Sequence, residues 1–118
     1  MDRTQVYGYN RSVSGKATQT QAFHNAINGT ITSDGIIVKS TIPLYARARE
    51  REITTGEIIG ALTAPLDITP IKYDAKNRPS KRYVGEKATV SVNPTNGNAT
   101  SCNKTYSKLV QKLKRKKG

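Results

Sequence analysis

Most apolar residues of the chain fall in short runs that alternate with polar residues, a pattern typical of β-strands. The clearest run is residues 87–92, where Ala88, Val90 and Val92 share one face of an expected strand. Residues 57–64 form the most apolar stretch. Its short length and internal glycine favour a central strand over a helix.

Residues 22–41 predict a β-hairpin. Ile27 and Ile31 alternate with polar residues, and residues 33–35 read Ser-Asp-Gly, the composition of a turn. A β-branched run follows at residues 36–42.

Two more strands are expected between residues 68 and 84. Ile68, Ile71 and Tyr73 mark the first, with Pro70 indicating an edge or a bulge. The second begins at Tyr83, after a basic loop at residues 74–82. Residues 93–98 are rich in turn residues and predict a loop that leads to a terminal helix capped by Ser101 or Asn103.

Residues 43–52 fit two structures. Their composition suits a helix with Pro43 in its first turn. As a strand, the segment would place Arg47, Arg49 and Arg51 on one face, about 6.6 Å apart. We favour the strand because the neighbouring segments have strand patterns.

The last fifteen residues before Gly118 predict an amphipathic helix with a basic end. Lys104, Lys108 and Lys112 form one line along it. The apolar positions have the spacing of a single helical face and are the expected packing anchors: Tyr106, Leu109, Val110 and Leu113.

These patterns together predict a mainly β fold, a small antiparallel sheet or open barrel of five to seven short strands. An extended N-terminal arm and a C-terminal basic amphipathic helix would flank it. The expected divisions are an arm at 1–21, a small β domain at 22–100, and the basic helix and tail at 101–118.

Composition adds a small core and a strong positive charge. The chain of 118 residues is 35% hydrophobic, with one Phe and no Trp, and its net charge is +12. A small protein with this excess of cations is expected to meet nucleic acid or an acidic protein surface.

The candidate contact residues lie in three positive regions. They are Arg47, Arg49 and Arg51 in the first, Lys76, Arg78, Lys81 and Arg82 in the second, and Lys104, Lys108, Lys112, Lys114, Arg115, Lys116 and Lys117 in the third.

The sequence offers little for catalysis or metal binding. One cysteine, Cys102, and one histidine, His24, cannot build a zinc site, and there is no glycine-rich phosphate loop. We therefore expect no enzyme activity, no catalytic or metal residues and no cofactor. The start of the sequence lacks an apolar signal segment, and no run is long enough to span a bilayer, which favours a place in the cytoplasm or in a virion.

Two functional hypotheses follow. The first is a non-enzymatic structural component of a large assembly, most simply a virion protein associated with a phage capsid. Its arm and tail would contact neighbouring subunits or packaged nucleic acid. The alternative is a small basic module that binds DNA or RNA, of the kind found in ribosomes. Neither hypothesis includes a small-molecule substrate or a membrane.

Overall fold

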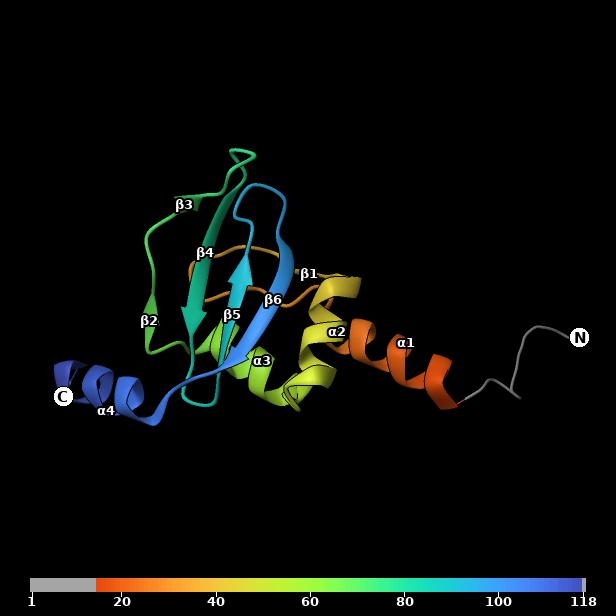
Figure 1. Cartoon of the computed structure of the whole chain (residues 1–118), viewed down its shortest axis with the longest axis horizontal. Helices are drawn as coiled ribbons and strands as arrows, with labels where there is room; N and C mark the ends of the chain where they lie inside the picture. The colour runs from red at the N-terminus through yellow and green to blue at the C-terminus, as the bar shows by residue number, and fades with distance from the viewer. Residues whose placement is uncertain (1–14, 118) are drawn as a thin grey trace, which may run out of the picture.

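The structure, a computed structural model, describes residues 15–117, and side chains within them from residue 19 to residue 115. Within these residues the chain forms four helices and six strands (Figure 1). In chain order they are α1 (Gly15–Ile27), β1 (Lys39–Ser40), α2 (Ile42–Glu50), α3 (Thr55–Thr63), β2 (Asp67–Ile68), β3 (Lys72–Tyr73), β4 (Pro79–Val84), β5 (Ala88–Val92), β6 (Asn98–Lys104) and α4 (Ser107–Lys117). The fold is mixed α/β, so the prediction of a mainly β protein is wrong.

The sheet is open and mixed. Its strand order is β1-β6-β5-β4-β2, with β3 also paired to β4. The β1–β6 pair is parallel, and the other pairs are antiparallel. The expected strand around Pro70 is divided into β2 and β3, since proline cannot donate a ladder hydrogen bond.

Helices α1, α2 and α3 pack on one face of the sheet and enclose the core (Figure 1). The alternation predicted for β5 is confirmed: Ala88, Val90 and Val92 are buried, whereas Thr89 and Ser91 are partly exposed on the opposite face. The helices contribute the larger side chains of the core, which are Phe23, Ile27, Leu44, Ile58 and Leu62.

Helix α3 occupies the segment that was expected to be a central strand. The Thr54 side chain accepts a hydrogen bond from the Glu57 backbone N–H at 3.1 Å, and the Glu57 carboxylate accepts one from the Thr54 N–H at 3.0 Å. This reciprocal capping box starts a helix. Ile58, Ala61 and Leu62 then form a buried helical face.

Helix α2 occupies most of the ambiguous segment at residues 43–52, so the favoured prediction of a strand there is wrong. Thr41 caps it by accepting a hydrogen bond from the Leu44 N–H at 3.2 Å, and Pro43 sits in the first turn. Leu44 and Ala48, one turn apart, are buried. The proposed strand face of three arginines therefore does not form.

The predicted hairpin at residues 22–41 is also mostly wrong. Ile27 is the last residue of α1, where it packs with Phe23 one turn earlier. The turn at residues 33–35 is confirmed, and an isolated antiparallel bridge joins Ile31 to Ile37 across it. Of the expected N-terminal arm, residues 1–14 lie outside the described part of the chain and residues 15–21 belong to α1.

Strand β6 replaces the expected loop and helix cap. Ser101 and Asn103 lie within it, and α4 begins only at Ser107. Gly97 directs the chain into β6 with a φ of +80°. A Cβ atom there would lie 2.2 Å from the carbonyl oxygen of Ile37, so this close approach requires glycine.

Asp34 ties the 33–35 turn to β4. Its carboxylate accepts hydrogen bonds from Thr32 and Lys81, and from the Tyr83 hydroxyl at 2.7 Å. Burial alone would raise the pKa of Asp34, but these hydrogen bonds, that from Lys81 foremost, lower it to about 2. The ionised carboxylate therefore stabilises the fold.

Replacing Asp34→Asn is expected to destabilise the protein by about 1–2 kcal/mol, because the charged acceptor of these hydrogen bonds is lost. The cost is limited because the side chain is 30% exposed, so hydration offsets part of the loss. The folded-state pKa of Asp34 lies below the ordinary value of 3.8. Its contribution to the free energy of unfolding is therefore complete above about pH 4 and is lost as the pH falls through about 2. Urea unfolding at stepped pH values should show a shallower acid decline for the variant. Glu50→Gln, at an exposed ion pair, is the control. Equal acid declines in both variants and the parent would contradict this role.

Candidate nucleic-acid interface

The face of the sheet opposite the helices is polar and open. Strands β4, β5 and β6 place side chains on it in rows set by their register. Val84, Thr89 and Asn103 form one row. Arg82 and Ser91 begin the next, which continues into β6.

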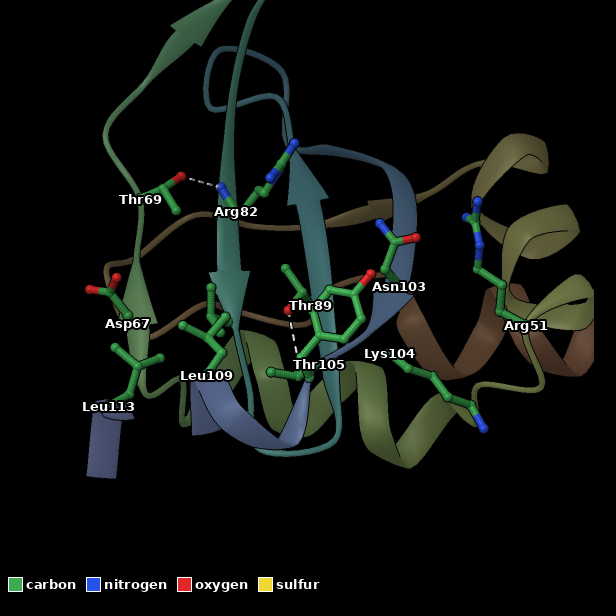
Figure 2. A pocket seen from close by; sticks show the side chains of 12 residues that line it. Arg51, Asp67, Thr69, Arg82, Thr89, Asn103, Lys104, Thr105, Leu109 and Leu113 are labelled. Carbon is green, nitrogen blue, oxygen red and sulfur yellow. Dashed lines mark hydrogen bonds between the residues drawn. The ribbon is translucent and has the colours of Figure 1, made fainter. Parts of the chain in front are cut away.

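A pocket of about 630 Å³ lies between this face and α4 (Figure 2). We call it the α4 pocket. Its volume is within the range of ligand sites in proteins. Its lining residues are Arg51, Asp67, Thr69, Arg82, Val84, Thr89, Asn103, Lys104, Thr105, Tyr106, Leu109 and Leu113.

The α4 pocket has an apolar side and a cationic side. Figure 2 shows Leu109 and Leu113 together on the side toward β2, whereas Arg51 and Lys104 lie on the opposite side. Arg82 projects from β4 above the two threonines in the middle (Figure 2). An arrangement of this kind can hold a ligand that has both an anionic and an apolar part.

The elements around the α4 pocket hold its polar groups in place. Arg51 follows α2 and donates a hydrogen bond from Nη1 to the carbonyl of Cys102 at 3.0 Å, which brings α2 to β6. The Arg82 backbone N–H donates to the Thr69 hydroxyl at 2.9 Å. The hydroxyls of Thr89 and Thr105 lie 2.9 Å apart.

Carboxylates neutralise several cations outside the α4 pocket. Among described side chains the ion pairs are Arg47–Glu50, Arg78–Asp74, Lys81–Asp34 and Lys114–Glu86. Within the same set, Arg51, Arg82 and Lys104 form no ion pair, although Asp67 lies at the other side of the pocket. The α4 pocket therefore retains uncompensated positive charge.

The first predicted positive region is divided by the helix. Arg47 is 3.4 Å from Glu50 on the exposed side of α2, and Arg49 donates to the Tyr45 hydroxyl at 3.0 Å. Arg51 alone of the three reaches the α4 pocket.

The second region is also divided. Lys76 and Arg78 lie in the turn between β3 and β4, where the Asp74 carboxylate accepts hydrogen bonds from both backbone N–H groups. Lys81 faces Asp34, and Arg82 faces the α4 pocket. The two neighbours point to opposite faces because side chains alternate along a strand.

The third region lies on β6 and α4. Lys104 lines the α4 pocket, and Lys108, Lys112 and Arg115 are exposed on the helix. Lys114 pairs with Glu86 at the β4–β5 turn. The side chains of Lys116 and Lys117 lie outside those described.

The four expected anchors of α4 differ in burial. Leu113 is 9% exposed, Val110 is partly buried, Leu109 is 37% exposed and Tyr106 is 81% exposed. Three of them, Tyr106, Leu109 and Leu113, form a wall of the α4 pocket. In Figure 1 this helix lies at one end of the sheet, beyond β2 and β4.

Four polar, uncharged residues of the site were not predicted from the sequence as contact residues: Thr69, Thr89, Asn103 and Thr105. The alternation in β5 contains the signal for Thr89, since the position between two buried residues must face away from the core. No comparable pattern marks Asn103, because β6 has few apolar residues.

Comparison with protein-family models, with curated proteins and with solved structures gives no match. Across residues 15–117, no cluster of three or more His, Cys, Asp or Glu side chains is placed to hold a metal ion. None of the described helices is long and apolar enough to cross a membrane.

Cys102 lies behind the site, fully buried in β6, and burial raises the pKa of its thiol to about 11. We expect a thiol reagent such as dithionitrobenzoate to modify the folded protein at least about 100-fold more slowly than the urea-unfolded protein at mildly alkaline pH, because the reactive thiolate is scarce and covered. Stopped-flow absorbance measures both rates. Equal rates would show that β6 is not packed as described.

Proposed function

We propose that this protein binds nucleic acid on the open face of its sheet, with phosphate groups held by Arg51, Arg82 and Lys104. The observation that supports this most is that these three cations all line one pocket and form no ion pair among the described side chains. The net charge of +12 gives the long-range attraction that such a ligand requires.

The remaining lining favours a nucleotide over a simple anion. Hydroxyl and amide groups at Thr89, Thr105 and Asn103 suit ribose and base edges. The exposed ring of Tyr106 and the leucine side of the pocket offer surface for a base. Exposed lysines on α4 extend the positive charge beyond the pocket, as a polymeric ligand would need.

The proposal is binding without chemistry. A single carboxylate, Asp67, lines the α4 pocket, and its other ionisable groups are arginine, lysine and tyrosine. General acid–base catalysis near neutral pH works best with a group that titrates there, and these residue types ordinarily do not.

Neutralising one pocket cation should weaken nucleic-acid binding and its salt dependence. For Arg82→Gln and Lys104→Gln we expect about tenfold weaker binding of a labelled oligouridylate at low salt. The slope of log affinity against log salt should fall by about one per variant. Fluorescence anisotropy at increasing salt measures both quantities.

Arg47→Gln is the matched control, since Arg47 is an exposed arginine paired with Glu50 away from the α4 pocket. Equal losses in all three variants would indicate non-specific attraction to a basic protein and overturn the assigned site.

Gel analysis of the recovered RNA tests the proposal that the protein binds its ligand without cleaving it. Shortened RNA, lost again in Arg82→Gln, would show that the pocket cleaves its ligand.

A role as a structural component of a larger assembly, such as a virion, is the second candidate. It is supported by large apolar side chains that the described part of the chain leaves exposed. Ile31, Ile37 and Ile42 are 59%, 61% and 75% exposed, and Ile31 and Ile37 are adjacent across their bridge. Exposed apolar groups of this kind are typical of surfaces that partners cover. A cytoplasmic or virion location belongs to this proposal.

If other copies of the chain cover the surface around Ile31 and Ile37, the apparent molecular mass of the protein should rise with its concentration. Sedimentation equilibrium measures this mass. The double substitution Ile31→Lys and Ile37→Lys should abolish the rise, because two buried charges would be left unpaired. Thr63→Lys, at an exposed position of α3, adds charge elsewhere as the control. A mass that stays monomeric for the parent would count against assembly through its own copies.

A further inference from the structure

A second pocket lies on the same open face, farther from α4. It has a volume of about 470 Å³, and β4, β5 and β6 line it with Ser80, Ser91 and Ser101. We call it the serine pocket. It reaches the β3–β4 turn and the β5–β6 loop, which lie together at one end of the sheet in Figure 1.

The two pockets follow one another along the strands. On each strand the residue in the serine pocket is two positions from a residue in the α4 pocket: Ser80 and Arg82, Ser91 and Thr89, Ser101 and Asn103. Residues two apart point to the same face and lie about 6.6–6.8 Å apart. Arg82 and Ser91 are direct cross-strand partners, so the pockets meet at that row.

The chemistry of the serine pocket differs from that of the α4 pocket. Serine hydroxyls and asparagine amides dominate its lining, and its one arginine, Arg78, is paired with Asp74 at 2.8 Å. Within the described residues, the hydroxyls of Ser80, Ser91 and Ser101 have no hydrogen-bond partner from the chain. The pocket therefore suits a neutral group that can both donate and accept hydrogen bonds.

We propose that the two pockets form one track for single-stranded RNA, in which one nucleotide lies in the α4 pocket with its phosphate at Arg82, and the ribose and base of the next nucleotide occupy the serine pocket. This rests on the proposed function and adds a second subsite to it. The ribose 2′-hydroxyl both donates and accepts, which matches the free serine hydroxyls and favours RNA over DNA. A concave track with α4 at one end suits unpaired nucleotides, whose base edges are accessible, rather than a duplex.

Ligands of two lengths test whether both subsites are used. A hexauridylate should bind the parent protein more tightly than uridine monophosphate, because only the longer ligand reaches both pockets. The double variant Ser91→Ala and Ser101→Ala should weaken hexauridylate binding about tenfold by removing two hydrogen bonds. Uridine monophosphate binding should not change. Ser33→Ala, at a serine outside the lining of both pockets, is the matched control.

Isothermal titration calorimetry with each ligand gives the affinities, and circular dichroism checks that each variant is folded. Equal affinity for the two lengths would overturn the track while leaving the proposed function intact. If Arg82→Gln binds both ligands as tightly as the parent, the proposed function itself fails. Equally tight binding of the deoxyribose hexamer, or tighter binding of a duplex, would overturn the assignment to single-stranded RNA.

Discussion

The packing of one sheet face on α1, α2 and α3 is the interaction on which the other features depend. With a hydrophobic fraction of 35%, the chain has enough apolar residues for one compact core. Ala88, Val90 and Val92 contribute the inward side of β5 to that core. The alternation that buries them turns Thr89 and Ser91 outward. A hydroxyl-rich open face is thus a direct result of how the core is built.

The sequence predicted the elements that carry their own periodicity and missed those that depend on caps or neighbours. Strand β5 alternates clearly and was found. Helix α3 was missed, since its strongest signal is the pair Thr54 and Glu57 and not its short apolar run. Strand β6 has little periodicity of its own, and its strand conformation depends on pairing with β5 on one side and β1 on the other.

The same limits apply to the candidate site. Arg82 and Lys104 were expected as contact residues from charge alone, and both lie in the α4 pocket. Arg51 was expected on a strand face, but it reaches the pocket because α2 ends beside β6. Charge in the sequence could not distinguish these from Lys81, whose carboxylate partner is far away in the chain. Pairing across long separations decides which cations remain available.

The position of β6 also governs when the protein can acquire its shape during synthesis. It lies between β1 and β5, yet it is the last strand in the chain. Until residues 98–104 leave the ribosome, β1 has no partner in the sheet, and the core lacks Ala99 and Cys102. Domains generally fold as units during translation, and distant pairings form late. The polar face of the sheet, and with it the α4 pocket and the serine pocket, therefore forms only with the finished fold.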